Sequence, residues 1–126
     1  MSIKIADGHN AIMPYIIVQD ADKFIDFLQT VFDAKIKFRM DTNDGSVMHA
    51  ELAIGEGVVM VSEASATFGK NTAGLFVYVA DTKQVYDLAI ENGATSIMEP
   101  RKADYADLTA GFLDPFGNTW WPATLA

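Results

Sequence analysis

Residues 14–21 read Pro-Tyr-Ile-Ile-Val-Gln-Asp-Ala, an apolar run of strand length that ends in an aspartate. Residues 75–82, Leu-Phe-Val-Tyr-Val-Ala-Asp-Thr, repeat this pattern. Aspartate is favoured at the start of a helix because its carboxylate accepts a hydrogen bond from a free backbone N–H. Each stretch therefore predicts a strand followed by a helix, with Asp20 or Asp81 as the N-cap. The repetition indicates one structural unit used twice.

The segments after the two aspartates have the periodicity of helices. In the first copy, five large apolar residues recur at the spacing of one helix face: Phe24, Phe27, Leu28, Val31 and Phe32. The second copy is shorter, with Val85, Leu88 and Ala89 at that spacing, and it ends at Gly93. Glycine readily adopts the left-handed conformation that ends a helix. Two amphipathic helices are predicted.

Each helix is followed by three strand-like segments. We predict strands at 35–40, 48–54 and 58–62 in the first copy, and at 95–99, 108–113 and 119–123 in the second. Glycine-containing turns at 55–57 and 114–118 join the last two strands of each copy. Residues 100–107 are predicted to form a longer loop, and the small, polar residues 63–73 a linker.

These elements predict a single α+β domain over residues 1–126, with two tandem βαβββ modules at about 10–62 and 74–124. The economical packing lays each helix on the outer face of its own sheet, so that two curved mixed sheets enclose a common pocket. Side-chain alternation then assigns Ile16, Val18, Met48, Ala50 and Trp120 to the helix side. It assigns a second set to the pocket: Met13, Tyr15, His49, Glu51, Phe76, Tyr78 and Trp121.

Charge and composition exclude several classes of protein. There are 9 basic and 17 acidic residues, giving a formal net charge of −8, and no cluster of Lys and Arg that would bind nucleic acid or an anionic membrane. No apolar run reaches transmembrane length, and residues 1–7 contain no apolar segment of the kind found in secretion signals, so we expect neither a membrane span nor an export signal. Cysteine is absent, which removes disulfides, thiolates and cysteine-based zinc sites. We expect a cytoplasmic protein.

Two sets of side chains are candidates for function. His49 and Glu51 lie two residues apart on one strand, where the carboxylate can orient the imidazole as a general base or ligand-binding donor. The alternative is a structural pair on a solvated or dimer-facing strand. The second set could bind a flat or apolar ligand, or simply pack in the core: Met13, Tyr15, Phe76, Tyr78 and Trp121, with Tyr105 as a possible lid from the 100–107 loop.

Other polar residues give weaker signals. His9 is expected at the surface in an N-terminal tail. Arg39 and Arg101 could meet an anionic ligand or be solvated. A metal bound by His49, Glu51 and another acid such as Asp107 is a further interpretation, but two ligands on one strand do not define a third.

Several short motifs together resemble one protein family. They are residues 114–121, Asp-Pro-Phe-Gly-Asn-Thr-Trp-Trp, together with residues 13–15, 48–52 and 98–100. In this order and spacing they resemble the vicinal-oxygen-chelate superfamily, and within it the PhnB-like branch. That superfamily includes glyoxalase I, extradiol dioxygenases, fosfomycin-resistance proteins and bleomycin-binding proteins. The resemblance covers roughly residues 9–124.

The resemblance implies where a metal would bind. Metal-using members place ligands on the first and last strand of each unit, positions that fall here on Met13, Gly74, Trp121 and either Met60 or Val61. Thioether, glycine, aliphatic and indole groups do not hold a hard or borderline divalent cation. We therefore expect no metal and no cofactor.

Function is predicted from the resemblance and the candidate residues together. The leading hypothesis is metal-independent binding of a small apolar or aromatic molecule, as in bleomycin-binding members. The alternative is a glyoxalase-like lyase or dioxygenase-like oxidoreductase that uses a displaced metal site or His49 and Glu51 as acid-base groups. A third interpretation is a scaffold whose hollow is filled. A homodimer is expected, because superfamily members often complete their pockets across a dimer.

Overall fold

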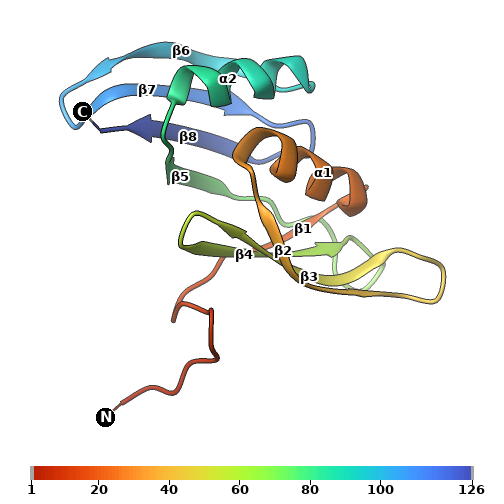
Figure 1. The fold of residues 1–126 in the computed structure, drawn as a ribbon. Coiled ribbons are helices and arrows are strands. Elements are labelled where there is room, and N and C mark those ends of the chain that lie inside the picture. The colour runs from red at the N-terminus through yellow and green to blue at the C-terminus, as the bar shows by residue number, and fades with distance from the viewer. Residues whose placement is uncertain (1, 126) are drawn as a thin grey trace.

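The computed structural model describes residues 2–125 and contains two modules of the same βαβββ topology (Figure 1). The first module contains β1 (Tyr15–Val18), α1 (Ala21–Phe32), β2 (Lys35–Asp41), β3 (Val47–Ile54) and β4 (Gly57–Glu63). The second contains β5 (Gly74–Tyr78), α2 (Thr82–Glu91), β6 (Thr95–Ala103), β7 (Ala106–Leu113) and β8 (Thr119–Thr124). The predicted α+β fold of two such modules is confirmed.

Each module forms its own four-stranded mixed sheet. The strand orders are β1-β4-β3-β2 and β5-β8-β7-β6, so the two sheets have the same topology. In each sheet the first strand runs parallel to its neighbour, and the other strand pairs are antiparallel. No helix among residues 2–125 is long and apolar enough to cross a membrane.

The modules pack together through their helices. In Figure 1, α1 lies between the two sheets, and its aromatic side chains reach into the second module. The Phe32 ring centroid is 4.5 Å from that of Trp120 on β8, and Phe27 meets Phe112 on β7 at 6.4 Å. Helices α1 and α2 also contact each other, and one buried core draws residues from both modules.

The relative placement of the modules therefore differs from the predicted one. The helices do not cover the outside of a pocket enclosed by both sheets. Instead, the helix-bearing faces of the sheets share the core, and the opposite faces point outward. The physical reason is the broad apolar face of α1, because Phe24, Phe27 and Phe32 bury more surface between two sheets than against one.

The start of α1 also differs from the prediction. Asp20 has a left-handed backbone (φ 58°), and its side chain makes no capping hydrogen bond. Glu63 at the end of β4 accepts hydrogen bonds from the backbone N–H groups of Asp20 (3.0 Å) and Ala21 (2.9 Å) instead. Asp81 does act as the predicted N-cap of α2, accepting from the backbone N–H of Gln84 at 3.1 Å.

Local irregularities explain the other differences. A β-bulge in β3 pairs Met40 with His49 but Asp41 with Val47, so Val47 is buried on the helix side and Met48 is half exposed. The predicted loop at 100–107 is mostly a hairpin between β6 and β7, with Tyr105 in its turn. Within the predicted linker, Asn71 exchanges backbone hydrogen bonds with Ile17 at 3.0 and 2.9 Å.

Candidate functional site

The outward face of the second sheet carries a group of aromatic side chains. Strand register pairs Phe76 with Trp121 and Tyr78 with Ala123, which places these residues on one face. Phe76, Tyr78 and Tyr105 are 49%, 65% and 57% exposed. The Phe76 ring centroid is 5.1 Å from Tyr78 and 6.0 Å from Tyr105. We call Phe76, Tyr78, Tyr105 and Trp121 the aromatic face.

Tyr105 is held over this sheet by a hydrogen bond. The Tyr105 hydroxyl donates to Oγ1 of Thr109 on β7 at 3.3 Å. The Thr109 hydroxyl in turn donates to the backbone oxygen of Pro122 on β8 at 3.1 Å. Tyr105 thus reaches back from the β6–β7 turn toward Phe76 on β5. The lid role expected for Tyr105 stays a prediction.

Trp121 is positioned by a glycine on the neighbouring strand. A Cβ atom built on Gly111 of β7 would be 2.7 Å from Cε3 of the Trp121 indole, closer than real Cβ atoms approach. The ring therefore occupies the space that a side chain at position 111 would need. No sequence pattern indicates this contact, because Gly111 lies within a strand rather than at a turn.

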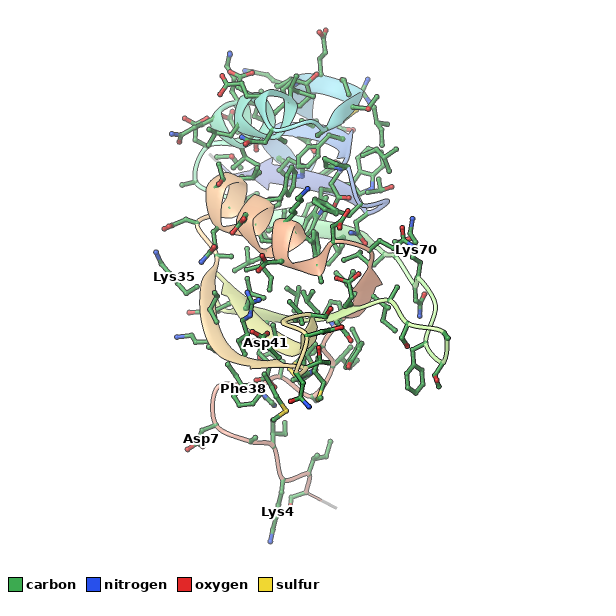
Figure 2. The ribbon with its side chains drawn as sticks, turned by 90° about the vertical axis from the view of Figure 1, so that its right-hand side faces the viewer. Lys4, Asp7, Lys35, Phe38, Asp41 and Lys70 are labelled. Atoms are coloured by element: carbon green, nitrogen blue, oxygen red, sulfur yellow. The ribbon has the colours of Figure 1, made fainter. Side chains whose placement is uncertain are left out.

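The outward face of the first sheet carries the predicted His49 and Glu51 pair. Nε2 of His49 is 3.0 Å from Oε2 of Glu51. The His49 ring lies between two aromatic residues, with centroids 5.7 Å from Tyr15 and 6.1 Å from Phe38. Figure 2 shows Phe38 on the side of β2 away from α1, toward the N-terminal segment that carries Lys4 and Asp7.

His9 joins this pair, contrary to its expected place in a surface tail. Its Nε2 is 2.7 Å from Oε1 of Glu51, and the side chains of His9, Glu51 and His49 are only 24%, 16% and 24% exposed. We call these three residues the His–Glu–His cluster. The hydrogen bond from His9, and then that from His49, lowers the pKa of Glu51, because both stabilise its anion.

The structure does not bring the two sets of site residues into one pocket. The aromatic face belongs to the second sheet and the His–Glu–His cluster to the first. Met13 precedes β1, is partly buried, and lies next to Ile12 and Pro14, which line a small groove of about 180 Å³ with Phe76. Tyr15 lies beside His49, so within one chain it belongs with the cluster.

The donor chemistry does not fit the metal that some superfamily members use. The side chains at Met13, Gly74 and Trp121 are unsuited to a divalent cation. In the His–Glu–His cluster, the two imidazoles bind different oxygens of one carboxylate rather than a common point. Among residues 2–125, no group of three or more His, Cys, Asp or Glu is placed to hold a metal ion.

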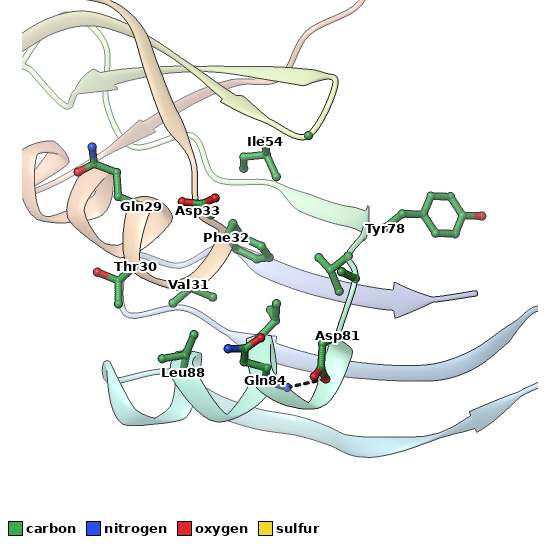
Figure 3. A pocket seen from close by; sticks show the side chains of 14 residues that line it. Gln29, Thr30, Val31, Phe32, Asp33, Ile54, Tyr78, Asp81, Gln84 and Leu88 are labelled. Carbon is green, nitrogen blue, oxygen red and sulfur yellow. Dashed lines mark hydrogen bonds between the residues drawn. The ribbon is translucent and has the colours of Figure 1, made fainter. Parts of the chain in front are cut away.

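A different groove, of about 420 Å³, lies between the two helices (Figure 3). It is bordered by Gln29 and Asp33 of the α1 end and by Asp81 and Gln84 of the α2 start. The carboxylate of Asp81 is engaged in capping α2. Of the predicted site residues, Tyr78 alone lines this groove, so the groove adjoins the aromatic face at Tyr78 and is separate from the His–Glu–His cluster.

The two candidate arginines differ in their surroundings. Arg39 donates to Asp22 at 2.8 Å and to Asp41 at 2.9 Å, and the contact with Asp41, followed by that with Asp22, raises the pKa of Arg39. Its charge is therefore already balanced within the chain. Arg101 takes part in none of the ion pairs found among residues 2–125.

Comparison with known proteins identifies relatives over most of the chain. Residues 8–121 match the family model described as the Glyoxalase/Bleomycin resistance protein/Dioxygenase superfamily. The protein Rv0887c of Mycobacterium tuberculosis (strain ATCC 25618 / H37Rv) is 27% identical over 121 residues, covering 87% of this chain and 71% of the relative.

Solved structures share the fold at lower identity. TioX from Micromonospora sp. ML1 superposes with a TM-score of 0.73 at 22% identity, covering 93% of this chain and all (100%) of TioX. A PhnB protein from Bacillus cereus gives a TM-score of 0.72 at 16% identity, covering 91% of this chain and 99% of that protein. The predicted resemblance is thus confirmed, and the chain belongs to the Glyoxalase/Bleomycin resistance protein/Dioxygenase superfamily.

Proposed function

We propose that the protein binds a small apolar or aromatic molecule on the aromatic face, without a metal. The observation that supports this most is that four aromatic residues from three segments gather on one outward sheet face, with three of them about half exposed or more. Water-exposed aromatic surface of this kind is stabilised by a ligand that covers it, because burial removes apolar area from water.

We further propose that a second copy of the chain completes the site. Small-molecule sites bury most of the ligand surface, which an outward-facing sheet cannot do alone. The first sheet presents its own apolar residues outward, since Tyr15, Phe38 and Met40 are 49%, 43% and 47% exposed. A homodimer that covers such faces would bury both aromatic surfaces and supply the missing wall.

The proposal is tested by thermal unfolding with a library of flat aromatic compounds. A ligand at a hundredfold excess over its dissociation constant should stabilise the fold by about 2.7 kcal/mol. We expect the response to be lost in Trp121→Ala and retained in Phe68→Ala. Phe68 is a matched control because it is 67% exposed but lies outside the aromatic face.

Two results would contradict this proposal. A wild-type protein that responds to no compound does not bind aromatic molecules, and a response retained in Trp121→Ala places the binding elsewhere. The second copy is tested separately by sedimentation at micromolar concentration. A monomer that still binds ligand contradicts the dimer but leaves the aromatic face as the site.

A second candidate function rests on the His–Glu–His cluster. An imidazole hydrogen-bonded to a carboxylate can accept a proton from a bound substrate, as in general-base catalysis. This favours a lyase or dioxygenase-type enzyme acting through His49 and Glu51. It is tested by turnover assays with and without added nickel, zinc, manganese or iron(II). Activity lost in His49→Ala and Glu51→Gln but kept in Trp121→Ala supports the enzyme, whereas activity unaffected by either cluster substitution contradicts it.

A further inference from the structure

The N-terminal segment places one of its own side chains on an acidic group of the first sheet. Glu51 has two oxygens, and each has a different partner. Oε2 is bound by His49, two residues away on the same strand, at 3.0 Å. Oε1 is bound at 2.7 Å by His9, which is 42 residues away and lies outside the sheets.

The surroundings of Glu51 suit a cation with an apolar body. Strand register places Tyr15, Met60, Glu51 and Phe38 in one row across the sheet, so the carboxylate lies between aromatic residues of the same face. The Glu51 side chain is 16% exposed, whereas Tyr15 and Phe38 are about half exposed. A partly buried carboxylate is stabilised by a nearby positive charge. The aromatic rings beside it can contact both the apolar body of such a ligand and its cationic group.

The segment that carries His9 is lightly anchored. Its backbone hydrogen bond from His9 to Ala6 lies within the segment itself. Ile3 and Ile12 are 75% and 87% exposed, and Figure 2 shows the chain around Lys4 and Asp7 extending away from the sheet. Terminal segments with few buried contacts exchange at little cost in free energy. The His9 contact can therefore be replaced without disturbing the core.

We propose that Glu51 is the recognition group of a binding site for a small organic cation, and that His9 occupies this site as an intramolecular stand-in that the cation displaces. The ligand class is a protonated amine, amidine or imidazolium carried on a flat apolar body. This site lies on the first sheet, so it does not rest on ligand binding at the aromatic face of the second. It differs from the acid-base role because the carboxylate binds charge and transfers no proton.

Competition by a tethered side chain has a measurable consequence. A site that is available only when His9 is displaced shows an apparent affinity reduced by the fraction of time it is free. Removing the His9 imidazole should therefore strengthen binding of a cation, on the order of tenfold if the contact is formed about nine-tenths of the time. A neutral molecule of the same shape lacks the charge that Glu51 recognises, so it should bind this site weakly whether or not His9 is present.

The experiment uses benzamidine as the cation and benzamide as its neutral counterpart, each titrated by NMR into the full chain. We expect benzamidine to bind His9→Ala about tenfold more tightly than the wild type, and benzamide to show no such difference. The gain should disappear in His9→Ala/Glu51→Gln. It should remain in His9→Ala/Glu56→Gln, a matched control because Glu56 is an exposed acid in the β3–β4 turn.

The outcomes separate this proposal from its competitors. No gain in His9→Ala, or a gain that survives Glu51→Gln, overturns it. If the Glu51→Gln chain does not fold, chemical shifts in His9→Ala decide instead. Benzamidine must then perturb the His49 and Tyr15 ring signals, and perturbation of the Trp121 indole N–H alone overturns the proposal. Loss of aromatic-ligand binding in Trp121→Ala leaves this result unaffected.

Discussion

The indole of Trp121 rests on Gly111, with no room between the ring and the β7 backbone for a Cβ atom. This contact between β7 and β8 positions the Trp121 ring within the aromatic face. The buried neighbour Trp120 packs on the other side of the sheet against Phe32. Two adjacent tryptophans thus have separate roles, one in the core and one on the outward face.

Gly111→Ala should displace the Trp121 ring. Overpacking of this kind costs about 1–3 kcal/mol of unfolding free energy, and we expect urea unfolding to show a loss in this range. Ligand responses at the aromatic face should weaken together with the loss. Gly74→Ala is the matched control, because a Cβ atom there meets nothing within 4 Å. Equal losses in the two variants would show that the ring shifts freely.

Asp114 organises the hairpin between β7 and β8. Its Oδ1 accepts from the backbone N–H groups of Phe116 (2.8 Å) and Asn118 (2.9 Å). Its Oδ2 accepts from the side chain of Asn118 (3.1 Å) and from Nε1 of Trp120 (2.8 Å). Asp114 is only 3% exposed, so water could not take the place of the carboxylate as the acceptor for these four donors.

Asp114→Asn should therefore destabilise the fold by about 3 kcal/mol, on the scale of one to two charge-assisted hydrogen bonds. The new amide group turns a donor toward groups that are themselves donors. Urea unfolding measures the loss, with Asp107→Asn as the control on the exposed part of β7. A change within about 0.5 kcal/mol, as expected for the control, would show that the Asp114 carboxylate does not stabilise the β7–β8 hairpin.

The two modules could be predicted from the sequence, but their packing could not. The strands and helices of each module follow from local sequence signals, such as the repeated pattern around Asp20 and Asp81 and the apolar face of α1. Alternation along β1 and β5, however, leaves apolar residues on both faces: Ile16 and Val77 on one, Tyr15 and Phe76 on the other. Nothing local states which apolar face is covered, because that depends on how α1 packs between the sheets.

Contacts distant in sequence were the other limit. His49 and Glu51 were predicted as a pair because residues i and i+2 share a strand face. His9 gave no such signal, since its segment has no periodic pattern. The role of Glu63 was missed for the same reason, because its carboxylate reaches the start of α1 from another strand.

Glu63→Ala should weaken the start of α1. The carboxylate accepts from two backbone N–H groups that have no partner within the helix, so its loss should cost about 1 kcal/mol, as for other N-cap deletions. Urea unfolding measures this loss against Glu56→Ala, which removes an exposed glutamate from the β3–β4 turn. Hydrogen exchange of the Ala21 amide should accelerate only in Glu63→Ala. Unchanged exchange there would show that Asp20 caps the helix after all.

The His–Glu–His cluster predicts an acid-dependent loss of stability. Because the pKa of Glu51 is lower in the folded chain than in the unfolded one, its anion stabilises the fold above the ordinary glutamate pKa of about 4.3. That contribution is lost as the pH falls through the lowered pKa. The wild type should therefore exceed Glu51→Gln in unfolding free energy at pH 7, and the difference should shrink below about pH 4.3.

His9→Ala provides the internal check on this pH dependence. The contact with His9 is the largest cause of the lowered pKa of Glu51, followed by that with His49. Without His9, the pKa of Glu51 should be lowered less, so the acid-dependent loss of stability should be smaller and should be complete at a higher pH than in the wild type. Urea unfolding from pH 7 to pH 3 measures both variants beside Glu56→Gln. If the wild type and Glu51→Gln differ by the same amount across that range, the imidazoles do not stabilise the Glu51 anion.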